Sequence, residues 1–239
     1  MTVRSDDPAS PDFYDDSYYR HALHGGHWFR DNDRKHQARM EAVLAALDPD
    51  LSDKILDLGC ADGRHTRMLA PVVGHIIGLD FSEAAIRIAS SGGGDPDRIE
   101  FVHADASRMS AIDAASIDKI VAIDFFEHVD DALLERILSE CWRVLKPVGR
   151  VVFYTPCASH YVERMKAAGF LLRQIPGHIA VRDGHAYRRL AKALPWDSID
   201  ISYLPSEYPL FRLIDRMMMK VPLLGPLFRF RVVGTLVKQ

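Results

Sequence analysis

The feature that most limits how this chain can fold is an alternation of short apolar runs with helical patterns. Five strands are expected in its central part, at Lys54–Leu58 and His75–Leu79 and in "IEFVHAD", "IDKIVAID" and "RVVFYTP". Helices are expected between them, at Gly63–Leu69, Glu83–Ala89 and Asp131–Leu145. Strands spaced by helices form a parallel sheet that is covered on both faces. We therefore predict an α/β fold with a doubly wound, mostly parallel sheet.

The pattern loosens after Pro156. Helices are expected in "HYVERMKAAGF" and at the end of "GHIAVRDGHAYRRLAKAL", and further strands in "SIDISYLP" and "RFRVVGTLVKQ". The segment "SEYPLFRLIDRMMMKVPLLGPLF" is strongly apolar and is interrupted by prolines. It allows two interpretations: an inserted helix packed on the sheet, or a flexible apolar wall for an apolar substrate, a use that suits methionine.

Charge is distributed unevenly along the chain. Residues from Cys157 onward hold 13 of the 30 Lys and Arg but 6 of the 33 Asp and Glu, which leaves 17 against 27 for residues 1–156. Either the surfaces simply differ, or the basic C-terminal part meets an anionic substrate or membrane. The cations that flank its apolar segment are Arg212, Arg216, Lys220, Arg229 and Arg231.

The spacing of the cysteines and the hydropathy of the sequence bear on the cellular compartment of the protein. Cys60, Cys141 and Cys157 have no disulfide or metal spacing. No secretory signal pattern is visible, and no stretch reaches the ~18 apolar residues that a membrane span requires. These features predict a cytoplasmic protein.

The loop "DLGCADG" after the first strand predicts a nucleotide-like ligand, because glycine lets a ligand approach the backbone closely. A dinucleotide would require G-x-G-x-x-G, which seats a pyrophosphate on a helix N-terminus. Here Arg64 stands in the place of the third glycine, and Asp57 at the strand end would repel a phosphate. Asp80, Asp105 and Asp124 follow at the ends of the next three strands, where such sheets bind ligands. The pattern favours a cationic ligand.

These segments resemble class I S-adenosylmethionine-dependent methyltransferases. "ILDLGCADGRHT" is similar to the first motif of that family, an acid followed by G-x-G-x-G, with Ala61 where glycine is more common. The resemblance continues through "GLDFSEAAIRIA", "FVHADASRM", "DKIVAIDFFEHVDD" and "ILSECWRVLKPVGRVVFYTP", and covers about Leu51 to Pro156. It implies the Rossmann-like methyltransferase fold, with seven strands of which the last is antiparallel. It also implies an S-adenosylmethionine-dependent methyltransferase.

The resemblance implies how S-adenosylmethionine would be held. Asp57 would orient the glycine loop and accept from the amino group of the ligand. Asp80 would accept from the ribose hydroxyls, as an acid does in dinucleotide folds. Asp124 would begin the segment that faces the sulfonium and the substrate. The other expected cofactor contacts are Gly59, Cys60, Ala61 and Gly63 along the methionine part, and Phe81, Asp105 and Ala106 around the adenine.

Methyl transfer from a sulfonium depends mainly on in-line positioning, which contributes on the order of 7–11 kcal/mol. A base is needed only when the acceptor is a hydroxyl or a protonated amine, and histidine is the usual one. We expect His128 to face the transfer site, as a general base or as a pocket wall. His160 and His178 are further candidates for the base, with a surface position as the alternative for each.

The N-terminal "HALHGGHWF" places His21, His24 and His27 three residues apart. No cysteine or carboxylate completes a metal site there, and Gly25–Gly26 would break a helix, so we predict no metal. A lid that turns over the cofactor is the preferred interpretation. The expected substrate contacts are Tyr18, Trp28 and Phe126.

A length of 239 residues fits one domain. We expect a disordered tail over 1–12, a helical lid over 13–50, the cofactor-binding core over 51–156, and substrate-covering insertions with the closing strands over 157–239.

The expected substrate is a small molecule methylated on oxygen or nitrogen, such as a quinone, a lipid intermediate or a secondary metabolite if it is apolar. Cys157 lies near the position of the nucleophile in RNA cytosine-C5 methyltransferases, but their Pro-Cys after the fourth strand is replaced by "DFFEHV". Nucleic acid is therefore not the expected partner. An RNA methyltransferase and a non-catalytic S-adenosylmethionine-binding protein stay as alternatives, and the oligomeric state is not predicted.

Overall fold

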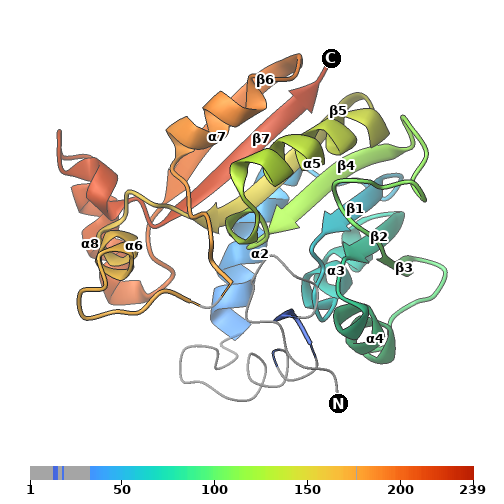
Figure 1. The fold of residues 1–239 in the computed structure, drawn as a ribbon, viewed down its shortest axis with the longest axis horizontal. Coiled ribbons are helices and arrows are strands. Elements are labelled where there is room, and N and C mark those ends of the chain that lie inside the picture. Colours follow the sequence, from blue (N-terminus) through green and yellow to red (C-terminus); the bar gives the residue numbers. More distant parts are fainter. Residues whose placement is uncertain (1–12, 16–17, 19–32, 176) are drawn as a thin grey trace.

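The computed structural model describes residues 13–15, 18, 33–175 and 177–239 of the chain. A seven-stranded sheet runs through the molecule with the strand order β3-β2-β1-β4-β5-β7-β6 (Figure 1). The strands are β1 (Lys54–Leu58), β2 (His75–Asp80), β3 (Ile99–His103), β4 (Ile117–Ile123), β5 (Leu145–Pro156), β6 (Trp196–Leu204) and β7 (Arg231–Lys238).

Strands β1 to β5 pair in parallel, and β7 lies antiparallel between β5 and β6. The predicted α/β class, with a doubly wound, mostly parallel sheet of seven strands and an antiparallel last strand, is confirmed. The five central strands also lie where the sequence places them. One boundary differs: β5 begins at Leu145 and not at Arg150, because the preceding residues continue as strand with a shift in the register to β4.

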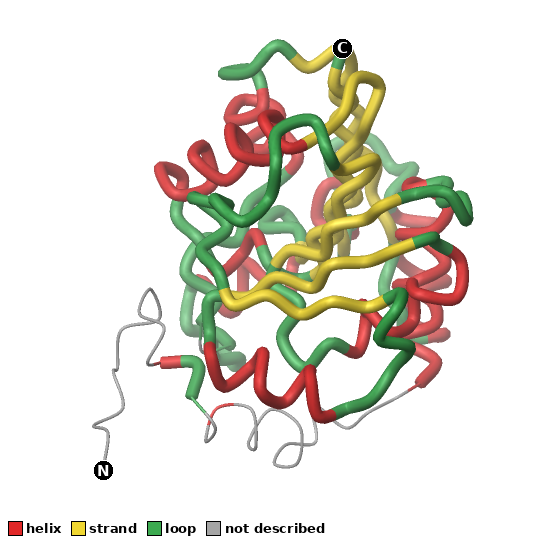
Figure 2. Tube along the Cα trace, turned by 90° about the vertical axis from the view of Figure 1, so that its right-hand side faces the viewer, coloured by secondary structure: helices red, strands yellow, loops and turns green. Residues whose placement is uncertain are grey.

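Helices cover both faces of the sheet, and Figure 2 shows the twisted layer of strands between them. The helices are α2 (Asp33–Leu47), α3 (Arg64–Leu69), α4 (Glu83–Ser91), α5 (Asp131–Val144), α6 (Tyr161–Ala167), α7 (Gly184–Ala191) and α8 (Pro209–Met218). Short 3₁₀ helices from residue 33 onward are η2 (Ala70–Val72), η3 (Phe126–His128) and η4 (Gly225–Phe228).

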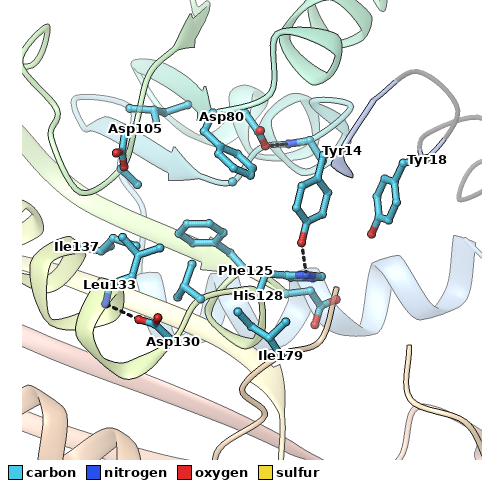
Figure 3. Close-up of a pocket in the computed structure, with 17 residues that line it drawn as sticks. Tyr14, Tyr18, Asp80, Asp105, Phe125, His128, Asp130, Leu133, Ile137 and Ile179 are labelled. Atoms are coloured by element: carbon cyan, nitrogen blue, oxygen red, sulfur yellow. Dashed lines mark hydrogen bonds between the residues drawn. The ribbon is translucent and has the colours of Figure 1, made fainter. Parts of the chain in front are cut away.

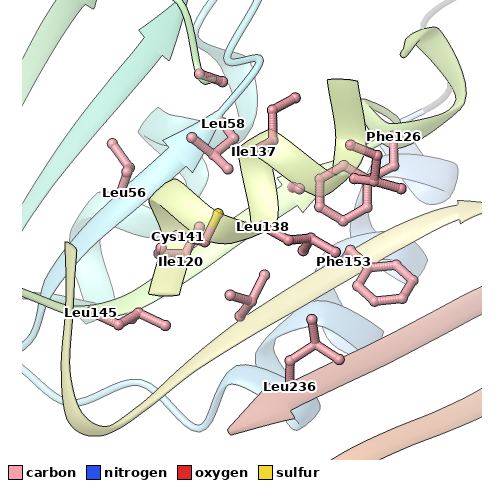
Figure 4. Packing of buried hydrophobic residues seen from close by; sticks show 14 of the residues in the cluster. Leu56, Leu58, Ile120, Phe126, Ile137, Leu138, Cys141, Leu145, Phe153 and Leu236 are labelled. Atoms are coloured by element: carbon pink, nitrogen blue, oxygen red, sulfur yellow. The ribbon is translucent and has the colours of Figure 1, made fainter. Parts of the chain in front are cut away.

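The two larger of three core clusters lie on opposite faces of the sheet. Helix α5 turns Leu134, Ile137, Leu138 and Cys141 toward the strands, at the three- and four-residue spacing of one helix face (Figure 4). On the other face, α2 contributes Met40, Val43 and Leu47. The central strands are apolar on both sides because both of their faces are covered.

This packing bears on the predicted lid over 13–50. Helix α2 belongs to the packed layer, since Val43 and Leu47 are fully buried against the sheet. Of the segment before α2, the structure describes Phe13–Asp15 and Tyr18, and the expected tail over 1–12 lies outside the described residues. The lid therefore stays a prediction for residues 13–32.

Helix α8 has a fully buried carboxylate. Asp215 is fully buried and accepts a hydrogen bond of 2.8 Å from the backbone of Ser206. Its apolar neighbours Leu213 and Met217 are 60% and 65% exposed, so these two side chains do not pack on the sheet. None of the described helices is long and apolar enough to cross a membrane.

Candidate functional site

A pocket lies at the carboxyl ends of the central strands, the edge at which open α/β sheets bind ligands. Loops after β1, β2, β3 and β4 form most of its wall, and Tyr14 and Tyr18 close one side (Figure 3). The described residues that line it are Tyr14, Tyr18, Gly59, Ala61, Leu79, Asp80, Phe81, Asp105, Ala106, Asp124, Phe125, His128, Val129, Asp130, Leu133, Ile137 and Ile179.

The glycine loop takes its shape from the end of β2. The backbone amides of Gly59 and Cys60 both donate to the carbonyl of Leu79. Gly59 has a φ of 69°, and a Cβ there would lie 2.5 Å from the ring of Phe125. The loop therefore requires glycine at this position, both for its left-handed backbone and for the close approach of Phe125.

Ala61 and Asp124 also adopt the left-handed region, with φ values of 48° and 49°. Side-chain-bearing residues pay roughly 1–2 kcal/mol for this conformation. The position of Ala61 is thus one that glycine would fill with less strain, in agreement with the family pattern quoted for the sequence. Strained residues of this kind concentrate at functional sites.

Asp80 fixes the loop to the end of β2. One of its carboxylate oxygens accepts from the backbone of Ala61 at 3.0 Å and the other from Ser82 at 2.9 Å. Its residue is only 6% exposed, and burial raises its pKa despite these hydrogen bonds. Asp80 therefore has a structural role as well, because two backbone amides donate to it.

The charge of the pocket discriminates between ligands. Its described lining contains the carboxylates of Asp80, Asp105, Asp124 and Asp130 but no lysine or arginine. A pyrophosphate would meet repulsion there, whereas a ligand with a sulfonium and an ammonium group would be attracted. The residues present therefore fit S-adenosylmethionine, whose positive charges lie in its methionine part.

Three expected cofactor contacts do not line the pocket. Asp57 is buried beneath the loop and accepts a 2.6 Å hydrogen bond from the hydroxyl of Thr66. Burial raises its pKa to about 7, against the opposing effect of that hydrogen bond. The thiol of Cys60 is buried, and Gly63 serves the turn into α3 with a φ of 72°. These residues support the loop from behind, and their contact with a ligand stays a prediction.

Asp124 carries two arginine partners. The guanidinium of Arg39 lies 2.7 Å from one oxygen and that of Arg231 lies 3.2 Å from the other. Burial alone would raise the pKa of Asp124, but the two cations outweigh it and lower that pKa to about 2. Asp124 is therefore a fixed anion, and its charge is largely compensated before any ligand arrives.

His128 lies in the pocket wall, as expected. Its Nδ1 is 3.1 Å from the hydroxyl of Tyr14, and its ring meets that of His178 edge-on at 5.0 Å between centroids. Burial lowers the pKa of both imidazoles, that of His178 to about 3. Both rings are thus neutral near pH 7, the form that can accept a proton or bind a metal.

Other expected residues lie elsewhere. His160 is 1% exposed and faces Asp215 at 3.8 Å, away from the pocket lining. Phe126 is buried against Phe153, with the rings 5.2 Å apart, and its neighbour Phe125 reaches the pocket instead. Trp28 lies outside the described residues, as do His21, His24 and His27 of the considered metal face.

Sequence reasoning missed part of the wall. Tyr14, Leu133, Ile137 and Ile179 line the pocket although no motif marks them. Leu133 and Ile137 are four residues apart on α5, so a helical projection of that segment could have placed them on one face. The carbonyl of Tyr14 accepts from the hydroxyl of Ser82 at 2.6 Å, a contact between distant segments that no local pattern predicts.

Comparison with protein families gives a match over the core of the sheet. Residues 55–149 match the family model described as a methyltransferase domain. A demethylmenaquinone methyltransferase of Clavibacter sepedonicus is 35% identical over 118 residues, which cover 48% of this chain and 47% of that protein. A ubiquinone biosynthesis O-methyltransferase of Aromatoleum aromaticum is 27% identical over 130 residues, 52% of this chain and 53% of the relative. The chain thus spans about half the length of these relatives.

Solved structures share the fold across nearly the whole chain. A SAM-dependent methyltransferase from Archaeoglobus fulgidus superposes with a TM-score of 0.70 at 17% identity, covering 93% of this chain and 100% of that one. A phosphoethanolamine N-methyltransferase 2 of Haemonchus contortus, solved with S-adenosyl-L-methionine, gives 0.63 at 16% identity over 96% of this chain and 57% of that one. At these identities the likeness concerns the fold alone.

Proposed function

Because this chain carries a class I S-adenosylmethionine-dependent methyltransferase domain, we propose that it transfers a methyl group to oxygen or nitrogen of a small molecule. The observation that carries the proposal is the pocket at the strand ends, whose described lining has no lysine or arginine and holds, besides the arginine-paired Asp124, the carboxylates of Asp80, Asp105 and Asp130. Such a lining selects a positively charged donor over a phosphate-bearing cofactor.

Different residues of the pocket would bind different parts of the cofactor. Asp80 would accept from the ribose hydroxyls, and Gly59 and Ala61 would leave room for the methionine part. Phe81 and Ala106, with the carboxylate of Asp105, would hold the adenine. When bound, S-adenosylmethionine supplies a methyl group already activated by its sulfonium. The chain's own contribution is to align the acceptor with that methyl and to exclude water.

In this proposal, His128 would take the proton from the acceptor. It lines the pocket, its pKa is lowered by burial, and Tyr14 holds its Nδ1 at 3.1 Å. The ring of His178 packs edge-on against that of His128 and would hold its orientation. His160 faces Asp215 and does not line the pocket, so we leave it out of the proposed mechanism.

The acceptor would be at least partly apolar. Phe125, Leu133, Ile137 and Ile179 give one side of the pocket an apolar wall. Two of the relatives bear the names of quinone methyltransferases, which agrees with such an acceptor. These features support a hydroxylated ring with an apolar substituent as the substrate class.

We include a peripheral membrane contact in the proposal. Helix α8 and the turn after it expose Leu213, Met217 and Leu223, the last by 95%, beside the exposed cations Arg212 and Arg216. An exposed amphipathic helix with basic residues binds anionic lipid surfaces. Arg231 takes no part in this surface, because it is engaged with Asp124.

The function is tested with methyl-labelled S-adenosylmethionine and a fractionated extract. We expect label in a small apolar product whose mass increases by one methylene unit. Label in RNA that is removed by RNase would favour the RNA methyltransferase instead. Cofactor binding without any labelled product would favour the non-catalytic alternative.

A further inference from the structure

Glu127, His128 and His178 come together at the wall of the pocket. Each offers one ligand atom, and these three atoms lie within 4.8 Å of one another. Two come from adjacent residues of η3, and the third comes from the segment after α6, about fifty positions along the chain. We propose that these three residues form a binding site for a divalent transition-metal ion. The catalytic part of this proposal rests on the proposed methyl transfer.

Two of the three proposed ligand groups contain a buried polar atom that has no hydrogen-bond partner. Glu127 is fully buried and its Oε1 has no hydrogen-bond donor, and the buried Nδ1 of His178 has no partner either. Buried polar atoms are nearly always satisfied, because leaving one unpaired costs about 1–3 kcal/mol. A cation placed between these atoms would satisfy both.

The remaining atoms of the cluster are held in the way that metal ligands are held. The other oxygen of Glu127 accepts from the hydroxyl of Thr155 at 2.9 Å. The Nδ1 of His128 faces the hydroxyl of Tyr14, and a backbone hydrogen bond joins this ring to Gly177. The tautomer with its proton on Nδ1 leaves Nε2 free to bind a metal. Second contacts of this kind orient ligating imidazoles and carboxylates.

The donor set indicates the class of metal. Two imidazoles and one carboxylate suit Zn²⁺, Fe²⁺, Mn²⁺ or Co²⁺ better than Ca²⁺, which prefers oxygen ligands alone. Three protein ligands leave at least one position for an outside oxygen. Because His128 lines the pocket, that position would be open toward the acceptor. The sequence analysis did not find this site, since His178 meets the other two only in the folded chain.

A metal ion at this site would favour, among the possible acceptors, a molecule that carries a hydroxyl group. It would act as a Lewis acid that lowers the pKa of the hydroxyl, whose proton passes to water. The oxygen then bonds to the methyl carbon, the methyl–sulfur bond breaks, and its electron pair stays on sulfur as a thioether. With its lone pair on the metal, His128 would bind and position rather than act as the base.

The test uses the full chain, stripped with EDTA and titrated with Co²⁺, which reports ligation by its visible absorption. We expect one equivalent to bind, and Glu127→Gln and His178→Gln each to weaken binding by at least about tenfold. His185→Ala, a change at an exposed histidine of α7, should bind as the wild type does. Circular dichroism and S-adenosylhomocysteine titration confirm that each variant is folded.

The outcomes separate the metal site from the proposed function. Saturable Co²⁺ binding that both variants lose supports the site, even if no methylated product is ever found. Absence of saturable binding to the wild type, or wild-type affinity in both folded variants, would overturn it. Undiminished methyl transfer by EDTA-treated enzyme would overturn the catalytic role and leave the proposed function standing.

Discussion

At the scale of single residues, the site is built from buried acids whose surroundings set their charge. Asp124 is held as an anion by Arg39 and Arg231, whereas Asp57, with one hydroxyl donor and no cationic partner among the described residues, has its pKa raised to about 7 by burial. Asp57 therefore destabilises the fold when it ionises. Its pKa is higher in the folded than in the unfolded chain, so the free energy of unfolding falls as pH rises between these values.

Asp57→Asn removes this titration and keeps an oxygen that can accept from Thr66. We expect the wild type to lose stability relative to the variant from about pH 4 to about pH 7, by an amount on the order of 4 kcal/mol. Denaturant unfolding of both proteins without ligand across this range measures the difference. Parallel stability profiles would show that the carboxyl of Asp57 titrates normally.

At the scale of elements, the last strand joins the edge strand β6 to the parallel part of the sheet. β7 pairs with β5 over Arg150–Pro156 and with β6 over Trp196–Leu204, and its end brings Arg231 to Asp124. Gly234 of β7 lies directly against the ring of Phe153, and a Cβ there would overlap that ring. Glycine within a strand often marks such a close approach.

Gly234→Ala should therefore destabilise the protein by about 1–3 kcal/mol, the usual cost of overpacking a core. The denaturant midpoint measures this loss. Phe153→Leu in the same background should recover part of it, because the smaller side chain vacates the space. If Gly234→Ala lowers the free energy of unfolding equally in the wild type and in the Phe153→Leu background, overpacking against this ring is not the cause.

The elements also show what the sequence could predict. The apolar runs located β1, β2 and β4 closely, because a strand buried on both faces leaves a largely apolar signal, as in "KILDL". Locating the strands also located the acids at the strand ends, and Asp80, Asp105 and Asp124 do line one pocket. The contact of Tyr14 with His128 and the proximity of His178 to Glu127 involve segments far apart in the chain, so no local pattern could reveal them.

At the scale of the whole molecule, the excess cations of the C-terminal part fall into two groups, one paired with acids and one exposed. Some C-terminal cations turn inward, as Arg231 does toward Asp124 and Arg182 does toward Asp131 at 2.7 Å. Others remain outside on α8, where the only acid of that helix, Asp215, is buried. That helix lies at one end of the molecule (Figure 1) and presents apolar and basic side chains together.

Vesicle co-sedimentation tests this surface. The chain should sediment with vesicles of phosphatidylglycerol and phosphatidylcholine, and weakly with phosphatidylcholine alone. Replacing Leu213 and Met217 together by glutamate should abolish binding, because it removes apolar area and adds like charge to the lipid surface. Leu51→Glu, at an exposed leucine outside α8, is the matched control. Binding unaffected by the double change would remove α8 as the contact.

The most direct measurement of the central claim is a calorimetric titration with S-adenosylhomocysteine. We predict that the wild type binds one equivalent and that Asp80→Asn binds at least about tenfold more weakly, since hydrogen bonds to a charged acceptor contribute about 1.5–3 kcal/mol. Asp97→Asn, at an exposed acid before β3, should bind as the wild type does. No binding to the wild type, or equal affinity in a folded Asp80→Asn variant, would contradict the account.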